Sequence, residues 1–135
     1  MGLINFNSVL AVGVKRFDDD HCRLIAITNQ LHEAIKTGTG HTAVQFALLQ
    51  LADYADAHFR AEEELLEQHG YPDLPSHRAA HQTILRRLAA IRAGFEDFGL
   101  PMQQDIMLFL LDWLTKHVKT ADRLYGPFLN SKGIF

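Results

Sequence analysis

His58-Phe-Arg-Ala-Glu62 and His77-Arg-Ala-Ala-His81, two stretches separated by fourteen residues, decide how this chain folds. Each stretch places two side chains that can bind a metal four residues apart, which on an α-helix means one face, one turn above the other. A sequence that needed only to fold would have leucine or isoleucine at these positions. The pattern therefore predicts a metal site inside a bundle of helices.

The composition is that of an ordinary soluble domain. The 135 residues are 47% hydrophobic and 21% charged, with a formal net charge of −3, and this length allows a single domain with a real core. Lysines and arginines are scattered, which argues against nucleic-acid binding and against a membrane-surface role. There is one cysteine, no signal-like N-terminus and no apolar run of about 18 residues, so we expect a cytoplasmic protein without disulfides.

Glycine and proline residues divide the chain into four predicted helices, over 18–36, 42–68, 73–95 and 102–124. Asp18 and Asp73 are the expected N-caps of the first and third. An N-terminal arm over 1–17 and a short C-terminal segment over 125–135 complete a single domain, 1–135. Because short connections make sequential helices antiparallel neighbours, we expect an all-α, up-down four-helix bundle.

The inward faces of these helices are largely apolar, and their polar residues are nearly all side chains that can bind metal. These metal-binding candidates are His21, His58, Glu62, His77, His81 and His117. In an up-down bundle all six converge at one level, because the first and third helices start where the second and fourth finish. Five imidazoles and a carboxylate exceed the four ligands typical of one zinc and suit two metals. Asp122 is the candidate second carboxylate, although an ideal α-helix turns it about 140° away from His117.

These residues resemble the hemerythrin family, in its single-domain bacterial form, over nearly the whole chain. The family's ligand order of one His, then HxxxE, HxxxH and HxxxxD is complete. The matching stretches are Val12-Gly-Val14, Asp18-Asp-Asp-His21, His58-Phe-Arg-Ala-Glu-Glu63, Tyr71-Pro72, His77-xxx-His81 and Trp113-Leu-Thr-Lys-His-Val-Lys-Thr-Ala-Asp122. One departure lies in the arm, where relatives often have tryptophan and this chain has Phe6.

The resemblance implies two iron ions joined by an oxo or hydroxo bridge. One iron would be held by His77, His81 and His117, the other by His21 and His58, and both would be bridged by Glu62 and Asp122. The second iron would keep one position open for dioxygen. Its apolar surroundings, any of which could equally be plain core, are expected to be Leu24, Phe59, Trp113, Leu114 and Val118. Iron itself rests on the resemblance, because copper and zinc bind such ligands at least as well.

The function implied by the resemblance is reversible dioxygen binding for storage, transport or delivery to an oxygen-consuming enzyme, by a protein that is not itself an enzyme. The oligomeric state is open, with a monomer favoured. The alternatives are a di-iron peroxidase or oxidase, a nitric-oxide-handling enzyme, and an oxygen or iron sensor. A polar, proton-donating residue beside the metals would favour an enzyme, and the inward rows contain none.

Three features beside the ligands have simpler explanations. Cys22 is expected to be a half-buried small residue, with redox sensing as a minor alternative. Glu63, Glu64 and Glu67 are expected to form a solvated face. For Asp20 two roles remain open, a hydrogen bond to a ligand imidazole or an acid in the first turn of a helix.

Overall fold

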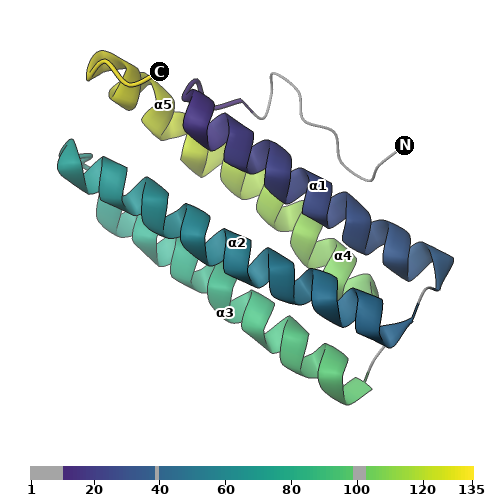
Figure 1. Ribbon diagram of the computed structural model, residues 1–135. Coiled ribbons are helices and arrows are strands. Elements are labelled where there is room, and N and C mark those ends of the chain that lie inside the picture. The colour runs from purple at the N-terminus through teal and green to yellow at the C-terminus, as the bar shows by residue number, and fades with distance from the viewer. Residues whose placement is uncertain (1–10, 39, 99–102) are drawn as a thin grey trace.

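Long helices lie side by side along one axis in the computed structural model, which describes residues 11–38, 40–98 and 103–135 (Figure 1). The elements are α1 (Lys15–Thr37), α2 (His41–Gln68), α3 (Leu74–Phe98), α4 (Gln103–Asp112), the π-helical segment η2 (Trp113–Asp122) and α5 (Arg123–Ser131). α4, η2 and α5 follow one another without a break. α1 and α3 each pack against both α2 and α4, so the predicted antiparallel four-helix bundle is confirmed.

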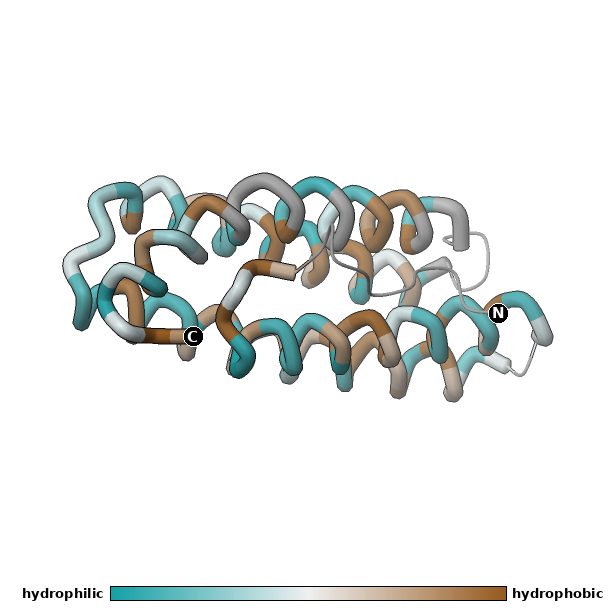
Figure 2. Tube along the Cα trace, turned by 90° about the horizontal axis from the view of Figure 1, so that it is seen from above, coloured by the Kyte–Doolittle hydropathy of each residue, from teal (hydrophilic) through white to brown (hydrophobic). Residues whose placement is uncertain are grey.

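Each helix turns an apolar stripe toward the others, and in Figure 2 apolar and polar residues alternate along the helices at this spacing. Every side of the bundle contributes to the core. The largest wholly buried side chains are Phe17, Leu24, Leu31, Leu48, Leu51, Phe59, Leu66, Leu88, Phe95, Ile106, Phe109 and Tyr125. The ligand residues interrupt this core at one level, where burial also removes them from water.

The first helix begins earlier than the sequence suggests. α1 starts at Lys15 after Val14, which is its N-cap, so the prediction that Asp18 caps this helix is wrong. Asp18 lies inside the first turn, and its Oδ1 accepts a hydrogen bond from the backbone N–H of Val12 at 2.7 Å. Phe17 is fully buried and holds this turn against the core. Part of the predicted arm is therefore helix, while Phe6 lies outside the described residues.

The fourth helix is longer than predicted. It continues through α5 to Ser131 instead of ending near 124, so most of the expected C-terminal segment is helical. A Cβ at Gly126 would collide with the carbonyl oxygen of Val12, so only glycine allows α5 to lie against the chain that precedes α1. This contact fixes the turn of α5 that carries Tyr125, a buried residue.

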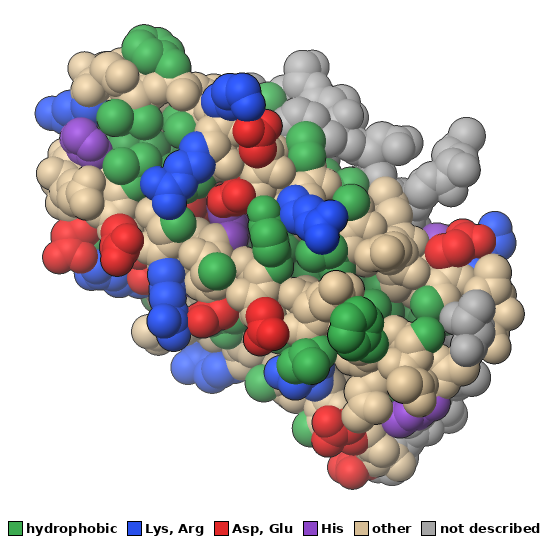
Figure 3. All heavy atoms as spheres, in the orientation of Figure 1, with side chains coloured by type: hydrophobic (Ala, Val, Ile, Leu, Met, Phe, Trp, Pro, Cys, Tyr) green, Lys and Arg blue, Asp and Glu red, His purple; other side chains and the backbone are tan. Residues whose placement is uncertain are grey.

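The outer surface mixes both signs of charge. On the face drawn in Figure 3, lysine and arginine side chains are interspersed with aspartate and glutamate and do not form a continuous basic stripe. Among the described residues, no helix is both long and apolar enough to span a membrane.

Candidate metal centre

The predicted ligands meet inside the bundle. They form two groups in which the ligand atoms lie within 4.8 Å of one another, and Asp122 belongs to both. The first group comes from α3 and η2 and consists of His77, His81, His117 and Asp122; the second comes from α1, α2 and η2 and consists of His21, His58, Glu62 and Asp122. The described helices thus bring together all seven side chains that the sequence selects.

Glu62 lies between the two groups and is fully buried. Its Oε1 is 3.1 Å from Nε2 of His77 and 3.2 Å from Nε2 of His81. Its Oε2 is 2.8 Å from Nε2 of His58 and 3.5 Å from Nε2 of His21. One carboxylate therefore offers a separate oxygen to each group, which is the arrangement that a bridging ligand requires.

The two oxygens of Asp122 also face different histidine groups. Oδ1 lies 3.0 Å from Nε2 of His117 and 3.1 Å from Nε2 of His77, while Oδ2 lies 3.2 Å from Nε2 of His21. The α-helical expectation that Asp122 points away from His117 is wrong, because η2 is a π-helix. Hydrogen bonding from i to i+5 widens the helical turn, which brings residues five apart toward the same face. The five-residue separation of the HxxxxD motif therefore matches the wider turn of the π-helix that contains it.

The buried carboxylates control the charge of the site. Burial alone would lower the pKa of His21, yet Asp122 and Glu62 raise it to about 9. Against the same effect of burial, Glu62 and Asp20 raise the pKa of His58 to about 10. Burial would raise the pKa of Glu62, but the imidazoles, His58 above all, hold it well below its ordinary value. In the metal-free protein a cation must therefore compete with protons on these imidazoles.

Several buried atoms of the site fit metal binding better than hydrogen bonding. Within the described part of the chain, Nε2 of His81, Nε2 of His117 and both oxygens of Asp122 have no aligned hydrogen-bond partner, although they are buried and close to one another. Unpaired buried polar atoms are costly. Imidazole nitrogens and carboxylate oxygens are also a donor set that suits first-row transition metals. The residues present therefore fit a pair of such ions.

Two acidic side chains that are not predicted ligands contact the Nδ1 atoms of predicted ligand imidazoles. Oδ2 of Asp20 lies 2.8 Å from Nδ1 of His58, which decides the open question about Asp20 in favour of the hydrogen bond. Oε2 of Glu63 lies 2.8 Å from Nδ1 of His81. The expected solvated role of Glu63 is therefore wrong, whereas Glu64 is exposed. Such partners fix the tautomer and orientation of a ligand imidazole.

Tyr125 is a polar residue of the site that the sequence does not reveal. Its hydroxyl donates a hydrogen bond to Oε2 of Glu62 at 2.7 Å, and its ring meets Phe17 edge-on with centroids 5.6 Å apart. Burial and the nearby carboxylates raise the pKa of Tyr125 well above its ordinary value, so the hydroxyl stays protonated. The inward rows of the predicted helices contain no proton donor, but Tyr125, which lies beyond the expected end of the fourth helix, places one beside Glu62.

The family model described as "Hemerythrin HHE cation binding domain" matches residues 12–129. This chain belongs to the hemerythrin family. It is 32% identical over 114 residues to a bacteriohemerythrin of Methylococcus capsulatus, covering 84% of this chain and 86% of that one. A bacteriohemerythrin of Stenotrophomonas maltophilia is also 32% identical, over 93% of this chain and 81% of its own. The crystal structure of wild-type hemerythrin matches with a TM-score of 0.85 and 30% identity, over 93% of this chain and 96% of that one.

An aromatic wall shields one side of the candidate metal centre. The ring of Phe59 stacks on His81 with centroids 3.8 Å apart and meets Trp113 edge-on at 5.7 Å. Leu24 and Val118 are buried as well, while the side chain of Leu114 lies outside what the structure describes. The ring of Phe17 also lies 5.9 Å from that of His58. The sequence does not predict this contact, because Phe17 belongs to the expected arm.

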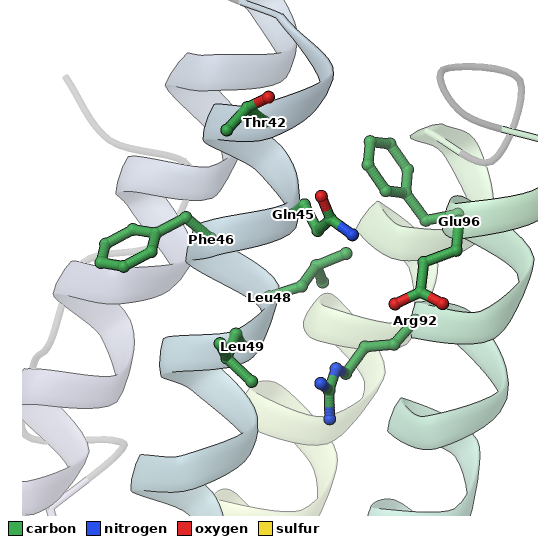
Figure 4. A pocket seen from close by; sticks show the side chains of 8 residues that line it. Thr42, Gln45, Phe46, Leu48, Leu49, Arg92 and Glu96 are labelled. Atoms are coloured by element: carbon green, nitrogen blue, oxygen red, sulfur yellow. The ribbon is translucent and has the colours of Figure 1, made fainter.

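Two other features lie outside the set of predicted metal ligands. Cys22 is exposed rather than half-buried, because its position next to His21 on α1 turns it about 100° toward solvent. A surface pocket of about 280 Å³ opens between the start of α2 and the end of α3 (Figure 4). It contains none of the seven ligands; its lining residues are Thr42, Gln45, Phe46, Leu48, Leu49, Arg92, Phe95 and Glu96.

Proposed function

We propose that this hemerythrin-family chain binds dioxygen reversibly at a di-iron centre, for storage, transport or delivery to an oxygen-consuming enzyme. The observation that carries the proposal is the arrangement of the oxygens of Glu62 and Asp122. In each carboxylate, one oxygen faces the first histidine group and the other oxygen faces the second. Two irons joined by an oxo or hydroxo bridge would together supply the two electrons that dioxygen takes up on binding. In this proposal the protein acts as a cytoplasmic monomer.

The two histidine groups are unequal, which supports an open position at one iron. His77, His81 and His117 would hold the first iron, and only His21 and His58 would hold the second. If both carboxylates and the solvent-derived bridge were shared, the second iron would have one protein ligand fewer than the first. Dioxygen would occupy the position that this difference leaves.

The surrounding side chains have roles that suit reversible binding. Phe59 and Trp113 are almost completely buried and exclude water, which would otherwise promote irreversible oxidation. Asp20 and Glu63 hold imidazoles by their Nδ1 atoms. The hydroxyl of Tyr125 holds Glu62 in place. Because these groups are fixed before a ligand arrives, little rearrangement accompanies its binding or release.

A di-iron peroxidase or oxidase is the second candidate, and Tyr125 is the observation in its favour. A buried hydroxyl within reach of the centre could deliver a proton to bound oxygen. We rank carriage first and propose that the chain is not an enzyme, because this hydroxyl already donates to Oε2 of Glu62. Releasing its proton elsewhere would leave that carboxylate without its partner.

An optical titration separates the two candidates. Iron-loaded protein, reduced under argon, is exposed to stepwise additions of dioxygen and then to vacuum, with zinc-loaded protein as the control. Carriage predicts a charge-transfer band that appears with dioxygen and disappears under vacuum over repeated cycles. A band that decays without returning, with hydrogen peroxide released or an added reductant consumed, would replace carriage by the enzymatic function.

A further inference from the structure

The two carboxylates that hold ligand imidazoles differ in their own partners. Asp20, which contacts His58, accepts a hydrogen bond at 3.1 Å from the hydroxyl of Tyr54. Glu63, which contacts His81, accepts one at 3.3 Å from Nε of Arg78. On the two-histidine side, which would hold the iron with the open position, the donor behind the carboxylate is a neutral phenol, Tyr54. On the three-histidine side, the donor behind the carboxylate is a cation, Arg78.

Solvent does not distinguish the two carboxylates. The side chain of Asp20 is 25% exposed and that of Glu63 is 24% exposed, so water screens them equally. The difference that the hydrogen bonds of the described residues show lies in Tyr54 and Arg78. Arg78 is itself held by a second ion pair, because its Nη2 lies 2.6 Å from Oε2 of Glu67.

A carboxylate that accepts a hydrogen bond from Nδ1–H makes the imidazole a more basic metal ligand. A donor on the far side of that carboxylate draws its charge away and weakens this effect. Because a cationic donor draws more charge than a neutral one, Glu63 should strengthen His81 less than Asp20 strengthens His58. A more basic imidazole favours Fe(III) over Fe(II).

We propose that Tyr54 and Arg78 are positioning residues that set the reduction potentials of the two irons unequally, Tyr54 through Asp20 and His58, and Arg78 through Glu63 and His81. The iron with the open position is then the better electron donor. The inference rests on the proposed di-iron centre. Neither Tyr54 nor Arg78 is one of the seven predicted ligands, and each side chain hydrogen-bonds to a carboxylate behind an imidazole. Both can therefore be changed without altering the metal's own donors.

The first test is a potentiometric titration under argon of the iron-loaded protein and two variants. Arg78→Met keeps the stem of the side chain and removes its charge, and we expect it to shift the preference for Fe(III) over Fe(II) about tenfold, a fall of about 59 mV. Tyr54→Phe should lower the potential by a smaller amount. Arg78→Lys, which restores a cation, should recover most of the loss.

Matched controls are Arg86→Met, an exposed arginine two turns further along α3, and Tyr71→Phe, whose hydroxyl belongs to neither set of hydrogen bonds. If Arg78→Met and Tyr54→Phe keep the potential of these controls, the proposal is overturned. A rise in potential in either variant would also overturn it, because that result would mean that the carboxylate had swung away from its imidazole.

The second test locates the effect. In zinc-loaded protein with ¹⁵N-labelled histidine, Tyr54→Phe should move the Nδ1–H resonance of His58 downfield, and Arg78→Met should move that of His81. Shifts at neither resonance, or at both in each variant, would contradict the two separate sets of hydrogen bonds. Neither test uses dioxygen, so irreversible oxygen chemistry would defeat the proposed carriage and leave this inference standing.

Discussion

Replacing Glu62 by glutamine tests the bridge directly, because the amide keeps the shape of the carboxylate and has one oxygen. In the native site, Oε1 faces His77 and His81 while Oε2 faces His58. Whichever way the amide turns, its NH₂ group must face one of the two histidine groups. An NH₂ group is a donor of hydrogen bonds and not a metal ligand. We therefore expect iron content to fall from two to at most one per chain.

The same change should destabilise the metal-free protein by an amount that can be worked out. Glu62 is fully buried among imidazoles whose pKa values it helps to raise, to about 10 for His58 and about 9 for His77. Removing one partner of a buried ion pair costs about 3–5 kcal/mol. With a urea m-value of about 2 kcal/mol/M, the unfolding midpoint should fall by about 2 M.

Two assays read these effects. Iron per chain is measured by mass spectrometry after anaerobic loading and desalting, and unfolding is followed by circular dichroism in urea with a chelator present. Glu64→Gln is the matched control, because Glu64 is an exposed residue of the same helix. Two tightly held irons in Glu62→Gln would refute the bridging assignment, and a midpoint equal to that of Glu64→Gln would refute the energetic argument.

Removing the Tyr125 hydroxyl by a change to phenylalanine should lower the unfolding free energy of the metal-free protein by about 1.5–3 kcal/mol, as expected for a hydrogen bond to a charged group; urea unfolding that matches Tyr71→Phe would contradict this. Because folding raises the pKa of His58 from 6.5 to about 10, its contribution is complete below about pH 6.5 and is lost as the pH rises through about 10. Urea midpoints of the metal-free protein at pH 6, 8 and 10 should fall in that order, and a constant midpoint would count against the buried pairing. Phe59→Ala should cost about 3–5 kcal/mol by leaving a cavity beside His81, and a loss under 1 kcal/mol in the same assay would show that the aromatic wall is not close-packed.

Local periodicity explains why the fold and most ligands could be predicted. Side chains four residues apart share a helix face, so His58 with Glu62 and His77 with His81 indicate both the helices and the inward direction. The up-down topology then follows from short connections, and the convergence of the ligands follows from the topology. Each of these steps depends on residues near one another in the sequence.

The errors arise where a residue departs from α-helical spacing or acts across the bundle. Asp122 faces His117 only because η2 is π-helical. The residue types in this stretch do not predict a π-helix. Tyr125 reaches Glu62 from α5, a helix that continues past Gly126 because its backbone packs tightly against Val12. Glu63 turns toward α3 rather than to solvent, because His81 offers it a partner there.

The sequence by itself determined the helices, the inward stripe and the kinds of atoms that could bind metal, since these follow from residue type and spacing along one helix. Only the tertiary structure decided which oxygen of Glu62 faces which histidine, and that Tyr54 and Arg78 stand behind different imidazoles. Such contacts join residues from separate helices. Their geometry depends on how the helices rotate and slide against one another, and the packing of the whole core sets both.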